Sequence, residues 1–109
     1  KAFLPGVLLS EQTIAAMISP AELSDGSVFS IPLEDGEATF GMGLEVFTWH
    51  EQVVPTKNGA ISGYSALFLA HPSSKTAVAV LTNLSDSGRA AQRIARKAAA
   101  LVSSGALPE

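Results

Sequence analysis

Two apolar runs separated by one short polar turn constrain the fold of this 109-residue chain most strongly. In Ala60–His71 the apolar side chains alternate between the two faces of a strand, and Thr76–Asn83 is apolar on both faces, as in a buried strand. The intervening sequence, His71-Pro-Ser-Ser-Lys75, is typical of a short turn. The two runs therefore predict an antiparallel hairpin.

A third strand is predicted over Thr39–Trp49, which contains Gly41 and Gly43. A glycine inside a strand marks a bulge or the close approach of another backbone. The segment from Pro20 to Gly36 is rich in Ser, Pro, Asp, Glu and Gly, so it is predicted to be a surface loop with one edge strand over Ser27–Ile31.

Helices are predicted at both ends of the chain. The first covers Leu8–Ser19, with Ser10 as its N-cap, and Pro20 ends it. The second covers Asp86–Ser104 and is capped by Asp86 or Ser85. Its predicted buried stripe consists of Ala90, Ile94, Ala98 and Leu101. Its predicted solvent face carries Arg89, Arg93, Arg96 and Lys97. The predicted fold class is α+β: a three-stranded antiparallel meander, a C-terminal helix packed on it and a short N-terminal helix.

Composition excludes several function classes. With 47% hydrophobic and 16% charged residues, the chain is predicted to fold rather than to be disordered. Without cysteine it has no disulfide, no zinc-thiolate site and no cysteine nucleophile. The net charge of -3 argues against a nucleic-acid partner, and no apolar run reaches the ~18–20 residues of a membrane span. His50 and His71 lie far apart in the sequence, so neither a metal site nor a cofactor is predicted.

The sequence contains no recognisable serine nucleophile. No serine is followed by lysine three residues later, the spacing that would let the amine take the hydroxyl proton. The Gly-x-Ser-x-Gly elbow is also missing, because Gly59-Ala-Ile-Ser62-Gly63 has a different spacing. No Tyr-x-Asn element occurs either.

The segment Val53–Tyr64 is the most unusual part of the chain, because it places Lys57 directly before Asn58 and Gly59. Taken alone, this sequence favours an ordinary Asn-Gly turn beside an exposed lysine. The alternative is a ligand site, in which the lysine cation lies beside backbone that a ligand can approach because Gly59 has no side chain.

An ordered series of segments resembles the penicillin-recognising serine hydrolases, which include class C β-lactamases, D-Ala-D-Ala carboxypeptidases and related esterases. Lys57-Asn-Gly-Ala-Ile-Ser-Gly-Tyr64 is similar to their Lys-Thr-Gly-Ala-x-Gly-Gly-Phe strand. Phe40-Gly-Met-Gly-Leu-Glu45 resembles the Gly-Leu-Gly-Trp strand before it. Phe68–Asn83 resembles the aromatic strand, proline turn and Val-x-Leu-Ala-Asn strand after it, and the Leu8 helix is typical of the upstream sequence.

The resemblance implies that residues 1–109 are the C-terminal part of a β-lactamase/transpeptidase-like domain whose nucleophile lies upstream. Lys57 would then supply positive charge beside the reactive serine, and the Ala60 amide would form half of the oxyanion hole. Asn58 stands where the family often has Thr and would bind the substrate carboxylate. Gly59 and Ser62 complete the implied substrate-binding residues.

The implied partners are the N-terminal part of the same enzyme and a small-molecule or peptide substrate. The resemblance also suggests a periplasmic or exported location. A different hypothesis is a non-catalytic binding or assembly module on the same scaffold. In either case the strands leave apolar surface uncovered when the chain is alone, so self-association is expected.

Overall fold

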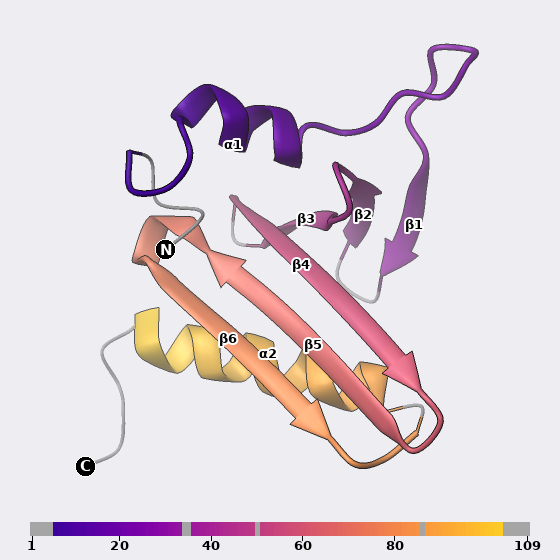
Figure 1. Ribbon diagram of the computed structural model, residues 1–109, viewed down its shortest axis with the longest axis vertical. Helices are drawn as coiled ribbons and strands as arrows, with labels where there is room; N and C mark the ends of the chain where they lie inside the picture. The colour runs from indigo at the N-terminus through magenta and orange to yellow at the C-terminus, as the bar shows by residue number, and fades with distance from the viewer. Residues whose placement is uncertain (1–5, 34–35, 50, 86, 104–109) are drawn as a thin grey trace. The chain divides into compact units, whose positions relative to one another are not determined.

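The computed structural model describes residues 6–33, 36–49, 51–85 and 87–103. Two α-helices and six strands lie in this part of the chain, which makes the fold α+β as predicted (Figure 1). The chain forms two compact units, Lys1–Pro55 and Thr56–Glu109, called the N-terminal and C-terminal units below. Neither described helix is long and apolar enough to cross a membrane.

The N-terminal unit consists of a short helix and a three-stranded meander. The helix α1 spans Glu11–Ile18, and Ser10 caps it by accepting a hydrogen bond of 3.1 Å from the Thr13 amide, as predicted. The antiparallel strands are β1 (Ser30–Leu33), β2 (Gly36–Phe40) and β3 (Glu45–Trp49). Ala38 and Phe47, which lie opposite each other on β2 and β3, are both buried.

Three sequence predictions in this unit need correction. The predicted strand over Thr39–Trp49 is two strands, because the chain turns between Phe40 and Glu45. The predicted edge strand over Ser27–Ile31 lies later, at Ser30–Leu33, and its neighbour begins inside the predicted loop. The first helix begins at Glu11 rather than at Leu8. In each case a short stretch was assigned to the wrong element, because its local sequence is compatible with both.

Gly41 lies where two backbones approach closely, as the glycine pattern predicted. The Met42 amide donates a hydrogen bond of 2.9 Å to the carbonyl oxygen of Met17, in the last turn of α1. A Cβ atom at position 41 would overlap this same oxygen. Gly43, two residues later, has φ +71°, which allows the tight turn into β3.

We predict that Gly41→Ala destabilises the protein by about 1–3 kcal/mol, because the added methyl group must push α1 away from the end of β2. Urea denaturation measures this difference. The matched control is Gly59→Ala, since a Cβ at position 59 meets no atom within 4 Å and the backbone has no positive φ there. Equal stability of the two variants would contradict the close approach.

The C-terminal unit is a second antiparallel meander with a helix. Its strands are β4 (Gln52–Ile61, which begins in the N-terminal unit), β5 (Tyr64–His71) and β6 (Thr76–Thr82). The 3-10 helix η1 (Pro72–Ser74) joins β5 to β6, which confirms the predicted hairpin. The helix α2 spans Gly88–Ser103 and packs on β5 and β6.

The predicted three-stranded meander is wrong in number. Besides the division of Thr39–Trp49, the prediction missed β4, because its Asn-Gly dipeptide and its proline are typical of turns. The predicted strand start at Ala60 is also wrong. Ala60 and Ile61 belong to β4, and a two-residue turn at Ser62-Gly63 separates them from β5.

The helix α2 buries a different face from the predicted one. Its most buried residues are Ala91, Ala95 and Ala99, spaced four residues apart, whereas Ile94 is 55% exposed. The small alanine side chains let the helix backbone lie close to the sheet, where Leu67 and Leu69 of β5 are buried. Close packing therefore selected the alanine stripe over the more hydrophobic stripe through Ile94 and Leu101.

Strand β6 also differs from the prediction, which made it apolar and buried on both faces. Its residues alternate, with Thr76, Val78, Val80 and Thr82 partly buried and Ala77, Ala79 and Leu81 exposed. Leu81 is 82% exposed. One face of this meander is therefore covered by α2, while the other displays apolar side chains.

The packing of α2 predicts unequal effects on stability for two neighbouring positions. Ala95→Leu should lower the free energy of unfolding by about 1–3 kcal/mol, because a larger side chain does not fit at the fully buried site. Ile94→Ala should change it by less than about 0.5 kcal/mol, because Ile94 is mostly exposed. Thermal denaturation followed by circular dichroism compares the two variants. A large loss for Ile94→Ala would favour the originally predicted stripe.

Candidate functional site

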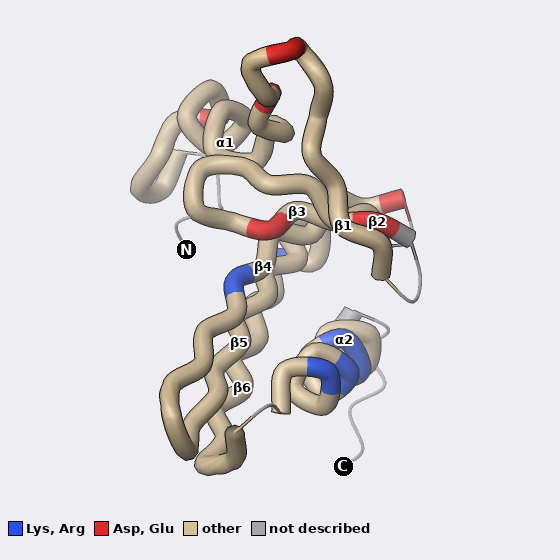
Figure 2. Tube along the Cα trace, turned by 90° about the vertical axis from the view of Figure 1, so that its right-hand side faces the viewer, with Lys and Arg blue, Asp and Glu red and all other residues tan. Residues whose placement is uncertain are grey.

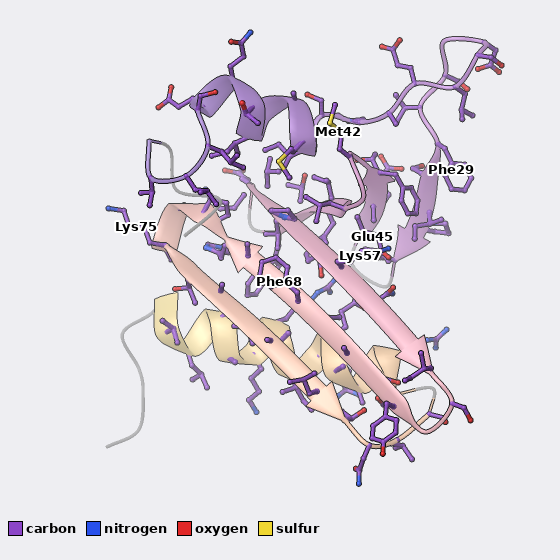
Figure 3. All side chains as sticks on the ribbon, viewed as in Figure 1. Phe29, Met42, Glu45, Lys57, Phe68 and Lys75 are labelled. Atoms are coloured by element: carbon purple, nitrogen blue, oxygen red, sulfur yellow. The ribbon has the colours of Figure 1, made fainter. Side chains whose placement is uncertain are left out.

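Lys57, Asn58 and Gly59 lie within strand β4, so the simple interpretation as an Asn-Gly turn is wrong. Antiparallel pairing with β5 holds them extended, with Lys57 opposite Phe68 and Gly59 opposite Ala66. Figure 3 labels Lys57 and Phe68 on these neighbouring strands. Pairing along the whole segment outweighs the local turn preference of Asn-Gly, because every second residue of the segment (Lys57, Gly59 and Ile61) gains ladder hydrogen bonds to β5.

The turn at Ser62-Gly63 fixes which backbone groups of β4 bond to β5. Ile61 and Tyr64 flank this two-residue turn, so they form a hydrogen-bonded pair. Bonded and non-bonded pairs alternate in an antiparallel ladder, which makes Gly59–Ala66 a bonded pair and Ala60–Ser65 a non-bonded one. The amide and carbonyl of Ala60 therefore point away from β5, toward the edge that we call the outer edge of β4. The same alternation turns the backbone of Asn58 to the outer edge.

Side chains in this segment alternate between the two faces of the sheet. Lys57, Gly59 and Ile61 share one face with Phe68 and Ala66 of β5, whereas Asn58 and Ala60 share the other. All residues from Lys57 to Ile61 are exposed. Among the described residues the structure gives Lys57 no salt bridge, so its ammonium group is available to an anion.

The structure thus places Lys57 and Ala60 on the same strand and directs the Asn58 side chain to the face opposite Lys57. The ammonium-bearing side chain of Lys57 and the outward amide of Ala60 lie three residues apart on the same strand. The Asn58 side chain projects from the opposite face to Lys57. Ser62 lies in the β4–β5 turn and is exposed.

An open hollow of about 710 Å³ adjoins this end of the meander. Its lining includes Gly59 and Ala60 of the candidate site, further residues of the three strands (Ile61, Tyr64, Ser65, Ala66, Leu81 and Thr82) and Asn83, which follows β6. Most of this surface is apolar, and Ile61 and Tyr64 are 73% and 58% exposed. Sequence reasoning missed Tyr64 and Leu81 as parts of this surface. The sequence shows the alternation of apolar residues in these strands, but it does not show which face of the strands α2 covers.

Hydrogen bonds to the β6–α2 connection hold the β4–β5 turn in place. The Gly63 amide donates a hydrogen bond of 2.8 Å to Ser85 Oγ, so the Ser85 side chain binds the β4–β5 turn. The buried Ser65 hydroxyl donates to the Leu84 carbonyl at 3.0 Å. Gly63 itself has φ +83°, a backbone conformation that residues other than glycine rarely adopt. The end of β4 is therefore positioned by contacts on both sides of the turn.

Among the described residues, which include His71, no cluster of three potential metal ligands is found. His71 is buried at the end of β5, and its Nδ1 lies 2.8 Å from Ser74 Oγ and 3.2 Å from Ser73 Oγ. These contacts tie the ring to η1. His50, Asp86 and Ser104, which the sequence analysis named, lie outside the described residues.

No family model matches this chain, and neither the search of curated proteins nor that of solved structures finds a match.

The backbone geometry of β4 predicts an alternating pattern of amide exchange. The Asn58 and Ala60 amides, which point to the outer edge, should exchange with solvent about tenfold faster or more than those of Gly59 and Ile61. Hydrogen–deuterium exchange followed by NMR measures each amide. Equal protection of Gly59 and Ala60 would show that the assigned direction of the Ala60 amide is wrong.

Proposed function

We propose that this chain is the C-terminal part of a serine hydrolase related to the class C β-lactamases, the D-Ala-D-Ala carboxypeptidases and their esterase relatives. Its contribution is the Lys-x-Gly strand and half of the oxyanion hole. The observation that carries the proposal is the direction of the Ala60 amide: it faces the outer edge of β4, three residues after an exposed lysine.

The reaction that such a strand supports is acyl transfer. A serine of the upstream part attacks the carbonyl carbon of an amide, β-lactam or ester, and negative charge develops on the carbonyl oxygen. The Ala60 amide donates a hydrogen bond to that oxygen, and the amide of the nucleophile itself is the second donor. One such donor is worth about 3–4 kcal/mol of transition-state stabilisation. Water then hydrolyses the acyl-enzyme.

Lys57 and its neighbours bind the substrate and stabilise negative charge at the reacting serine. The ammonium group of Lys57 stabilises negative charge beside the serine and attracts a substrate carboxylate. Gly59 leaves the backbone accessible, since no atom lies within 4 Å of the place where its Cβ would be. Asn58 and Ser62 supply polar groups for the substrate. The Asn58 side chain projects from the opposite face of β4 to Lys57.

The exposed apolar face of the C-terminal unit supports the proposal that this chain has a covering partner. Ile61, Tyr64 and Leu81 are mostly exposed on that face. In the proposed enzyme the upstream part of the polypeptide covers it and brings the serine to the outer edge of β4. The same surface is where the isolated chain would self-associate.

A non-catalytic binding or assembly module is the second candidate, and the same exposed face favours it. The sequence upstream of the chain distinguishes the two functions. Ser-x-x-Lys and Tyr-x-Asn motifs in that sequence support the hydrolase, and their absence supports the binding module.

We predict that Ala60→Pro in the full-length gene product lowers kcat for a p-nitrophenyl ester by about 10²–10³-fold, because proline removes the oxyanion donor. The fold should persist, since the lost amide does not bond to β5. Lys57→Ala should also lower kcat/KM, whereas the matched control Lys75→Ala, at the exposed end of η1, should leave it unchanged. The isolated 109-residue chain should show no turnover.

Steady-state kinetics and labelling with a fluorescent penicillin test these expectations. Full activity of a folded Ala60→Pro variant would overturn the proposed oxyanion role. Hydrolysis by the isolated chain that is abolished by Lys57→Ala would show that the nucleophile lies within it, contrary to the proposal.

A further inference from the structure

Charge is divided very unequally between the two units. The N-terminal unit holds eight of the ten acidic residues and one basic residue, whereas the C-terminal unit holds six of the seven basic residues. Figure 2 shows several blue Lys and Arg positions on α2 and a further one on β4, whereas red Asp and Glu positions lie along the segments of the N-terminal unit. The N-terminal unit is therefore acidic and the C-terminal unit is basic.

The basic surface is centred on a shallow hollow along α2. Ala90, Arg93, Ile94 and Lys97 line this hollow, which has a volume of about 330 Å³ and is called the α2 hollow below. Helix α2 contains no acidic residue, so Arg93 and Lys97, four residues apart, repel each other. Among the described residues neither has a salt bridge. An exposed Ile94 between two unpaired cations suits a partner that is both acidic and apolar.

The N-terminal unit displays a segment of that composition at Glu22–Phe29, called the acidic loop below. A bridge between Glu22 and Val28 and a hydrogen bond from the Leu23 amide to the Ser27 carbonyl close it into a small hairpin. The Ser27 side chain and amide donate to Asp25 Oδ1 at 2.6 and 2.9 Å. These bonds lower the pKa of Asp25, so its carboxylate stays charged.

The acidic loop also carries apolar side chains. Leu23, Val28 and Phe29 are each about half exposed beside the carboxylates of Glu22 and Asp25. Two carboxylates with neighbouring apolar groups match the two cations and the isoleucine of the α2 hollow in sign and in number. Both surfaces are held by secondary structure, so little order is lost when they meet.

We propose that the acidic loop of one copy of this chain docks on the α2 hollow of a second copy, pairing Glu22 and Asp25 with Arg93 and Lys97 around Ile94. The contact joins two different surfaces, so it builds chains or rings of copies rather than only closed dimers. A lipid surface or a nucleic acid fits less well, because the net charge of -3 and the acidic N-terminal unit would be repelled. This contact is independent of the proposed hydrolase site.

Sedimentation velocity over a range of protein concentrations tests the proposal. All chains carry Leu81→Gln, which removes the most exposed apolar side chain of the C-terminal unit and so weakens association through that face. Association should weaken by about tenfold or more when NaCl rises from about 50 to about 500 mM, because exposed charges are screened. Arg93→Glu with Lys97→Glu should abolish it, whereas the control Lys75→Glu should not.

A charge exchange identifies the two surfaces. Glu22→Lys with Asp25→Lys should also abolish association, and an equimolar mixture with the Arg93→Glu, Lys97→Glu chain should restore it, since each variant then meets opposite charge. Asp25→Lys removes the bonds to Ser27, so Glu22→Lys alone, which keeps them, should still weaken association measurably.

Three results would overturn the proposal. One is a monomer at every concentration and ionic strength. Another is association that strengthens with salt or persists in the Arg93→Glu, Lys97→Glu chain, which would assign it to apolar surface. The third is binding of α2 to phosphatidylserine vesicles by a chain that does not self-associate, which would assign the α2 hollow to lipid.

Discussion

The alternation of hydrogen bonds along the β4–β5 pair is the constraint on which the candidate site depends. The two-residue turn at Ser62-Gly63 makes Ile61 and Tyr64 a bonded pair, and every pair further along the ladder follows from it. A shift of one residue would turn the Ala60 amide inward and move Lys57 to the face that α2 covers. The contacts of Gly63 with Ser85 and of Ser65 with Leu84 hold the turn, and therefore the register, in place. The direction of the proposed oxyanion donor, the Ala60 amide, is thus determined by the turn at the end of β4.

The alanine stripe of α2 determines which side chains of this helix are buried against the meander and which are exposed. Because Ala91, Ala95 and Ala99 are small, the helix lies close to β5 and β6. Ile94 is then exposed between Arg93 and Lys97 rather than buried. The same packing choice that completes the core of the unit creates the basic surface on α2.

Local signals in the sequence predicted local structure well. The Ser10 cap, the end of α1 before Pro20 and the turn between β5 and β6 each depend on side chains and backbone within a few residues, and each is present. Gly41 was predicted to mark a close approach, and the carbonyl of Met17 is its neighbour. The failures lie where distant residues decide. Asn58-Gly59 is a turn sequence in isolation, but pairing with Leu67 and Ala66 keeps it extended.

The sequence by itself determined the α+β class, the hairpin of β5 and β6, and the separation of acidic and basic residues along the chain. These features depend on residue type, order and period, all of which can be read directly from the amino acids. Only the tertiary structure decided that the strands number six, that α2 packs through alanine, and that the Ala60 amide faces the outer edge of β4. The reason is physical: strand register and the buried face of a helix are selected by close packing against partners far away in the sequence.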